Sequence, residues 1–302
     1  MQATLCIGVA LAVIAAAGLP LPSPDQLLMT KFAFSFVDCS AGVPWNLTNP
    51  FDSPPVCQWL GVTCEAQTKR VQSVSWEFLP CKGLADLSLL PQTVEGVFLG
   101  QHLTGTVDLS RLPQALKTLD LSGNQLSGVV NLAQLPVSLT MLDLSYNKFS
   151  GEPALASLPR GLNSLNLGHN RFSGPVNISA LPTSLQALYL NANAHTGRPD
   201  LSHLRDAITL LDLSGNNLTG TPEMTQLPSN LELLYLNKNA FQGTPDLSKL
   251  PAALQFLNMD DNEGLCGAMI SNDPCDTFQF PWHCKRYNHT DGGCAIHCPV
   301  CN

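Results

Sequence analysis

Two stretches of sequence decide the fold: LPTSLQALYLNANAHTGRPDLSH at residues 181–203 and LPSNLELLYLNKNAFQGTPDLSK at residues 227–249. Each is 23 residues long, and both are copies of a unit with the consensus LPxxLxxLxLxxNxLSGxPxLxx. The Leu-Pro pair that opens the unit recurs at steps of 23 or 46 residues, at Leu112, Leu135, Leu158, Leu181, Leu227 and Leu250. Internal repeats of this length indicate a solenoid, in which each turn buries its apolar side against its neighbours.

An asparagine recurs without exception every 23 residues, at Asn124, Asn147, Asn170, Asn193, Asn216, Asn239 and Asn262. With the leucines before it, this asparagine matches the leucine-rich repeat signature LxxLxLxxN. In that reading each LxxLxL segment forms a short parallel strand whose leucines point inward. The asparagine side chains then satisfy backbone groups inside the solenoid as a ladder.

The predicted fold class is therefore an α/β-type solenoid, a leucine-rich repeat horseshoe with disulfide-stapled caps. We expect nine short parallel strands, beginning near residues 71, 94, 116, 139, 162, 185, 208, 231 and 254. Glycine recurs four residues after the asparagine, where it suits a tight or positive-φ backbone, and proline two residues later favours an extended return path. The convex side should therefore be mostly non-helical.

The cysteines divide the chain into four parts. One of the eleven lies in the first ten residues, four lie between 39 and 81, and six lie between 266 and 301. We predict a signal peptide at 1–17, an N-terminal cap at 18–66, repeats at 67–265 and a cysteine-rich C-terminal cap at 266–302. The first segment, MQATLCIGVALAVIAAA, has the apolar run and small residues of a cleaved signal but no basic residue, so an uncleaved anchor or buried helix is the alternative.

The predicted compartment is extracellular, either secreted or associated with the cell surface. Signal cleavage would leave ten cysteines, an even number that fits disulfides in an oxidising environment. No later segment reaches transmembrane length and no apolar tail follows the last cysteine, so we expect a soluble product. Four sequons are candidates for glycosylation, although such tripeptides also arise by chance: Asn46, Asn177, Asn217 and Asn288.

The segment CQWLGVTC at 57–64 resembles the N-terminal cap of plant-type extracellular leucine-rich repeat proteins. That resemblance implies a Cys57–Cys64 disulfide. Cys81 stands at a position that apolar residues fill in later repeats, and Cys39 is its remaining partner in the cap, so we predict a Cys39–Cys81 bond. Before these cysteines, Leu27, Leu28, Phe32 and Phe36 have helical spacing.

NEGLCG at 262–267 resembles the plant-type C-terminal cap, which favours a Cys266–Cys275 bond. The remaining cysteines allow three pairings that the sequence leaves open: Cys284, Cys294, Cys298 and Cys301. Three histidines in this segment and the CPVC motif make zinc the alternative to disulfides. The secreted setting favours disulfides, and we expect no metal and no cofactor.

The repeat unit and both caps together resemble the promastigote surface antigen family of trypanosomatid parasites. Those proteins share a plant-like N-cap, repeats of similar length with a recurring SG or TG, and a cysteine-rich end. The chain departs from them because it has no Thr-rich stalk and no GPI tail, so membrane anchoring does not follow from the resemblance.

Charge and motifs exclude several function classes. Only 13% of residues are charged, the net charge is −8 and no basic block occurs, which argues against nucleic-acid binding. No nucleophile elbow, phosphate loop or HExxH motif is present. Carboxylates recur at two repeat positions: Asp120, Asp143 and Asp212 share one, and Asp108, Asp200 and Asp246 share the other. They could form a paired acid/base site, or they could be a polar surface residue that was duplicated with the repeat. We predict that the protein is not an enzyme.

The predicted binding site lies on the concave face, the outward side of the LxxLxL strands. Two outward positions per strand alternate with the inward leucines. On the later strands these positions are aromatic or aliphatic and should form one patch: Tyr189, Leu210, Leu233, Tyr235 and Phe256. Exposed apolar clusters rimmed by polar groups mark interaction sites. The alternative is that LYLN and LDLS are merely two repeat variants copied in tandem.

The favoured function is a secreted or cell-surface recognition or adhesion module that binds a protein or glycan ligand through this patch. One alternative is an inhibitor or decoy for a secreted hydrolase, and another is an enzyme or metal protein built on the C-terminal Cys/His segment. Ligand identity and oligomeric state are not encoded in any motif that we recognise.

Overall fold

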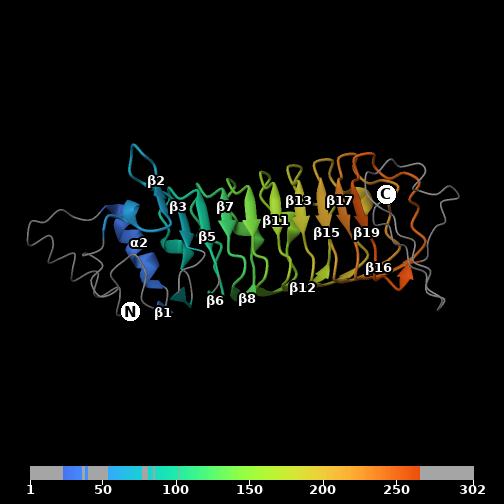
Figure 1. The fold of residues 1–302 in the computed structure, drawn as a ribbon, viewed down its shortest axis with the longest axis horizontal. Coiled ribbons are helices and arrows are strands. Elements are labelled where there is room, and N and C mark those ends of the chain that lie inside the picture. The colour runs from blue at the N-terminus through green and yellow to red at the C-terminus, as the bar shows by residue number, and fades with distance from the viewer. Residues whose placement is uncertain are drawn as a thin grey trace, which may run out of the picture.

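A computed structural model describes residues 23–35, 38–39, 54–76, 81–83, 86–100 and 102–265. The predicted signal peptide, the C-terminal cap with its six cysteines, Phe36, Asn46 and Asn288 lie outside the described residues. Within them the chain forms a stack of turns that runs from the N-terminal cap to the last repeat (Figure 1).

The main sheet has ten strands and confirms the predicted row of nine parallel repeat strands. These nine are β3 (Val71–Trp76), β5 (Gly96–Leu99), β7 (Thr118–Asp120), β9 (Met141–Asp143), β11 (Ser164–Asn166), β13 (Ala187–Tyr189), β15 (Leu210–Asp212), β17 (Leu233–Tyr235) and β19 (Phe256–Asn258). After β3, each strand begins two residues later than the sequence predicted, because the first leucine of LxxLxL precedes the hydrogen-bonded segment. The tenth strand, β2 (Val62–Cys64), belongs to the cap and pairs antiparallel with β3.

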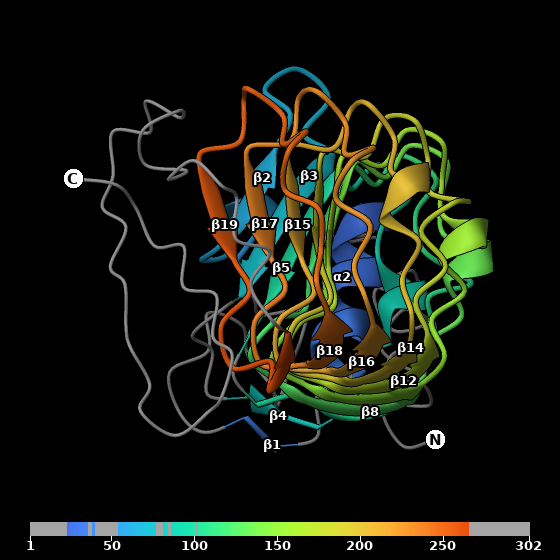
Figure 2. The ribbon, with the colours of Figure 1, turned by 90° about the vertical axis from the view of Figure 1, so that its right-hand side faces the viewer.

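A second, eight-stranded parallel sheet, which the sequence analysis did not anticipate, forms an adjoining wall of the solenoid (Figure 2). Its strands are β6 (Thr104–Gly105), β8 (Gln125–Val129), β10 (Lys148–Gly151), β12 (Arg171–Pro175), β14 (Ala194–Gly197), β16 (Asn217–Gly220), β18 (Ala240–Gly243) and β20 (Gly264–Leu265). The recurring glycines in its first seven strands, from Gly105 to Gly243, adopt positive φ angles, for example 90° at Gly128 and 89° at Gly151, as the repeat pattern predicted.

The return path of some turns contains single 3₁₀ turns instead of α-helices, in agreement with the predicted non-helical convex side. These turns are η3 (Leu87–Leu89), η4 (Leu132–Gln134), η5 (Leu155–Ser157) and η6 (Leu201–His203). In η3, η4 and η6 the residue before the turn accepts a hydrogen bond from the N–H two residues later, as Asp200 does from Ser202 at 3.2 Å.

Leucines fill the core between the two sheets, and an asparagine ladder crosses from turn to turn. The Asn147 side chain donates to the carbonyl of Leu121 in the preceding turn at 2.8 Å and accepts from the N–H of Leu126 at 2.9 Å. It also donates to the carbonyls of Leu144 and Ser145 in its own turn. The same arrangement recurs from Asn124 to Asn262, so each asparagine joins two adjacent turns.

The N-terminal cap covers the first turn with helix α2 (Pro24–Ser35), which contains Leu27, Leu28 and Phe32 as predicted, although of these three only Phe32 is fully buried. Ser23 caps the helix by accepting from the N–H of Gln26 at 3.0 Å, and proline at the first helical position fits this start. The helix buries Met29, Phe32 and Ala33, and the Phe32 ring stacks on Trp76 of β3 with centroids 5.5 Å apart.

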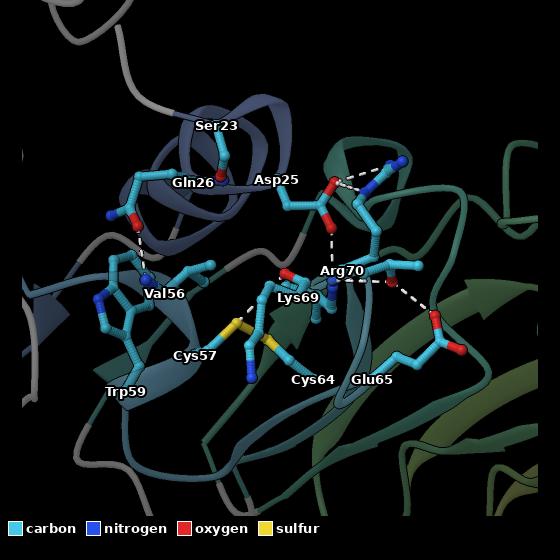
Figure 3. Close-up of a disulfide and its surroundings, with 12 residues drawn as sticks. Ser23, Asp25, Gln26, Val56, Cys57, Trp59, Cys64, Glu65, Lys69 and Arg70 are labelled. Carbon is cyan, nitrogen blue, oxygen red and sulfur yellow. Dashed lines mark hydrogen bonds and ion pairs between the residues drawn. A yellow bond between two sulfur atoms is a disulfide. The ribbon is translucent and has the colours of Figure 1, made fainter. Parts of the chain in front are cut away.

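A disulfide within the cap, and an ion pair between the cap and the start of the first strand, stabilise this end of the solenoid (Figure 3). Cys57, in η2 (Val56–Gln58), and Cys64, in β2, are joined with their Cα atoms 5.6 Å apart. Asp25 of α2 is 1% exposed; its carboxylate pairs with Arg70 at 2.8 Å and accepts from the N–H of Val71 at 2.7 Å.

The antiparallel pair β1 (Asp38–Cys39) and β4 (Cys81–Lys82) places Cys39 directly opposite Cys81. A backbone register of this kind is what the predicted Cys39–Cys81 disulfide requires. The bond itself stays a prediction.

Candidate ligand-binding face

The candidate site is the outward side of the ten-stranded sheet, which corresponds to the predicted concave face. Neighbouring strands are paired in register, so outward residues line up in two rows across the sheet. The first row ends with Ala187, Leu210, Leu233 and Phe256, and the second with Tyr189, Asp212, Tyr235 and Asn258. The inward leucines between them are buried, which fixes the direction of the outward side chains.

The structure brings all five predicted patch residues together on four successive strands, β13, β15, β17 and β19. Each of the five is half-buried, although nothing in the described residues covers this side of the sheet. The rings of Tyr235 and Phe256 are 5.0 Å apart between centroids and tilted by 38°. Neighbouring side chains in the rows thus provide the partial burial, and the patch is a packed surface.

Asp212 lies between the two tyrosines of the second row, paired with Tyr189 on one side and Tyr235 on the other. Partial burial raises the pKa of Tyr189, and the negative charge of Asp212 raises it further. The same two causes raise the pKa of Tyr235. Both hydroxyls therefore remain protonated at neutral pH, and the patch combines apolar area, two hydrogen-bonding hydroxyls and one carboxylate.

The recurring carboxylates have a structural explanation. Asp120, Asp143 and Asp212 each accept a hydrogen bond from the backbone N–H two residues later, at 2.8 to 2.9 Å. Asp108 and Asp246 accept in the same manner at the start of the return path. The hydrogen bonds to Ser110 and Ser248 lower the pKa of those two carboxyls. Turn formation thus accounts for both repeat positions without a paired acid/base site.

One surface feature was missed by the sequence analysis. Tyr146 and His169, in the loops after β9 and β11, are exposed and stacked with ring centroids 4.0 Å apart. Both have positive φ, 53° and 54°, at a repeat position where Gly123 and Gly215 stand in other turns. The available signal was the occurrence of two aromatic rings one period apart at a glycine position.

The described sequons lie away from the concave face. Asn217 is exposed at the start of β16, on the second sheet. Asn177 is exposed on the return path, where its side chain accepts from Ser179. Glycans at either position would leave the patch open.

Within the described ranges, no group of three or more metal-binding side chains occurs. Over the same residues, no helix is both long and apolar enough to cross a bilayer. The predicted Cys266–Cys275 bond, the four cysteines after it and the histidines around them fall outside those ranges.

Comparison with known proteins supports the repeat assignment. A family model described as Leucine Rich Repeat matches residues 115–134 and 138–158. No curated protein sequence matches the chain. Among solved structures, a plant ice-binding protein is similar with 27% identity and a TM-score of 0.59, over 81% of this chain and 87% of that one.

Two plant receptor complexes have a similar fold. The structure of PEPR1 with AtPEP1 has 24% identity and a TM-score of 0.59, over 80% of this chain and 42% of that one. The Arabidopsis receptor kinase HAESA, in complex with the peptide hormone IDA and the co-receptor SERK1, has 24% identity and a TM-score of 0.58, over 81% and 46%. The chain thus spans less than half of the length of these two. Together with the 23-residue spacing and the asparagine ladder, these similarities show that the chain has a leucine-rich repeat fold, with plant leucine-rich repeat proteins among its structural neighbours.

Proposed function

We propose that the protein is an extracellular recognition module that binds a protein, peptide or glycan ligand through the concave face. The carrying observation is the packed cluster of aromatic and aliphatic side chains on β13 to β19, which faces outward in register. Tyrosine is among the residues that contribute most binding energy at interfaces, and the contacts around such residues exclude water. The two described sequons leave this face open, and the Cys57–Cys64 disulfide fits an oxidising compartment.

Secretion or surface display, glycosylation and membership in the promastigote surface antigen family belong to the same proposal. The peptide-bound receptors among the structural neighbours are compatible with a peptide ligand. The alternative role as an inhibitor or decoy would use the same face against a secreted hydrolase. Loss of hydrolase activity at stoichiometric protein would distinguish it from adhesion.

The test uses ligands selected against the whole protein from a displayed random peptide library and from a glycan array. Replacing Tyr189 and Tyr235 by alanine should weaken binding of the selected ligands at least tenfold, since both tyrosines contribute aromatic contact area to the patch. Phe98→Ala is the matched control, because Phe98 is an aromatic residue in the same row, half-buried on the distant strand β5. Equal binding by the double variant and wild type would refute the assignment.

One observation favours a second candidate, ice binding. The outward side of the second sheet places a hydroxyl residue before each glycine in successive turns, at Ser127, Ser150, Ser173, Thr196 and Thr219. The match to the plant protein that is described as ice-binding covers 87% of that protein's length. Thermal hysteresis of the purified protein, abolished by Thr196→Tyr but not by Tyr189→Ala, would support this function, and freezing without hysteresis would exclude it.

A further inference from the structure

In the second outward row of the concave face, one aspartate stands between two tyrosines on neighbouring strands. Tyr189, Asp212 and Tyr235 are direct neighbours on β13, β15 and β17. Adjacent strands lie about 4.8 Å apart, so a group seated above Asp212 would be within reach of both tyrosine side chains. Partial burial raises the pKa of both tyrosines, and the nearby Asp212 carboxylate raises each pKa further.

The Asp212 carboxylate is held by one oxygen and open at the other. Its Oδ1 accepts from the backbone N–H of Ser214 at 2.9 Å and from the Ser214 hydroxyl at 2.6 Å. Within the described part of the chain, Oδ2 accepts no hydrogen bond and Asp212 forms no ion pair. The turn therefore fixes the side chain and leaves its second oxygen without a hydrogen-bond partner among the described residues.

The charged side chains in the two outward rows of the concave face are all negative. The two outward rows of the nine repeat strands contain three carboxylates, Asp120, Asp143 and Asp212, and no lysine, arginine or histidine. An anionic ligand would be repelled from these rows, whereas a cation would gain from Asp212 and from the faces of two aromatic rings.

Apolar area adjoins the carboxylate directly. Leu210 precedes Asp212 on the same strand by two residues, so both point outward, and Leu233 and Phe256 continue that row on β17 and β19. Arginine and lysine carry an aliphatic stem behind the charged head, which suits a surface where apolar area and a carboxylate are neighbours.

We propose that the Tyr189–Asp212–Tyr235 row is a subsite for a basic side chain, arginine or lysine, of an extended peptide ligand. The charged head pairs with Oδ2 of Asp212 between the two rings, and the stem and the next apolar residue of the peptide pack on Leu210, Leu233 and Phe256. This subsite rests on the proposed concave-face function and names the ligand chemistry that the face selects.

The structure supplies a conservative variant for the test. Asn166 and Asn258 stand at the same repeat position as Asp212 and accept the same turn hydrogen bond, each at 3.0 Å. Asp212→Asn therefore removes the charge and keeps the turn. Asp120→Asn is the matched control, since Asp120 accepts the same turn bond from Ser122 on a strand outside the patch.

The experiment selects peptides from a displayed random library against wild type and measures their affinity for each variant. We expect enrichment of arginine or lysine in the pool, a loss of affinity of about tenfold with Asp212→Asn, and no loss with Asp120→Asn. Added salt should weaken binding to wild type and have little effect on the Asp212→Asn variant.

Two outcomes separate failure of the subsite from failure of the function. Peptides that need Tyr189 and Tyr235 but show no basic enrichment, and bind Asp212→Asn as well as wild type, would overturn the subsite and leave the concave-face function intact. A pool whose binding is indifferent to the tyrosines would overturn both.

Discussion

His195 is the one ionisable side chain in the inward row of the second sheet, and its replacement provides a sharp test of the packing argument. The side chain is 1% exposed, at the position that Phe172 and Leu218 fill in the neighbouring turns. Its Nδ1 lies 3.4 Å from the carbonyl oxygen of Gly174, and its Nε2 has no hydrogen-bond partner. We predict that His195→Phe stabilises the protein.

The magnitude follows from the unpaired nitrogen and from proton linkage. A buried polar group without a partner costs about 1–3 kcal/mol, which the phenylalanine variant recovers at pH 7. Burial lowers the pKa of His195 from 6.5, and the contact with Gly174 only partly opposes this. The unfolded chain therefore binds more protons below pH 6.5, and stability falls as pH falls. Between pH 7 and pH 5 this loss is at most about 2 kcal/mol for one group.

Urea denaturation of wild type and His195→Phe at pH 7 and pH 5 measures both effects. The variant should have the higher free energy of unfolding at pH 7, and its advantage should grow at pH 5. His203→Gln is the control, because His203 is exposed on η6 and its loss should change stability by about 0.5 kcal/mol or less. A variant no more stable than wild type at pH 7, or an advantage that shrinks on acidification, would refute the reasoning.

Three further predictions concern the ladder, the cap and the backbone. Asn147→Ala removes bonds to two turns and should lower the free energy of unfolding by about 3 kcal/mol, measured by urea denaturation, since it leaves buried backbone groups unpaired. Arg70→Ala leaves the buried Asp25 carboxylate without its cation and should cost about 2–3 kcal/mol, seen as earlier unfolding of the cap by hydrogen exchange; unchanged exchange in α2 would contradict it. Gly61→Ala places a Cβ 2.1 Å from a backbone oxygen of β3 and should lower the melting temperature clearly more than Gly123→Ala, which has a similar positive φ and open space around it; equal effects would contradict the steric argument.

The repeat strands could be predicted from the sequence because their leucines and asparagines are fixed by burial. Leu165, Leu188 and Leu211 are fully buried at one repeat position, and any polar residue there would lose its water. The patch followed from the same periodicity, since the outward positions are determined once the inward ones are known.

The second sheet was harder to predict because its segments show no clear alternation of apolar and polar residues within one repeat. Lys148 pairs with Ser127, 21 residues earlier, although the repeat is 23 residues long, so each strand is staggered by two residues against the last. The strands are also short and contain a glycine at positive φ, which is a weak strand signal. The turn-capping role of the aspartates was equally hidden, because it depends on backbone geometry after the strand.

The distribution of cysteines and the location of the patch have a common physical origin. Each ladder asparagine joins two turns through buried hydrogen bonds, so the repeats between Cys81 and Cys266 are fastened without disulfides. The N-terminal cap has a neighbour on one side only, and there a disulfide within the cap and an ion pair from the buried Asp25 to Arg70 add stability. Because inward positions must remain buried, outward positions are freer to differ between turns. The first outward row changes from Thr118 and Met141 on early strands to Leu233 and Phe256 on late ones. A ligand seated on β13 to β19 would explain why the apolar residues collect on adjacent strands around a single carboxylate, whereas tandem copying of one repeat variant would place them there without a ligand. Binding by the Tyr189→Ala and Tyr235→Ala variants distinguishes the two explanations.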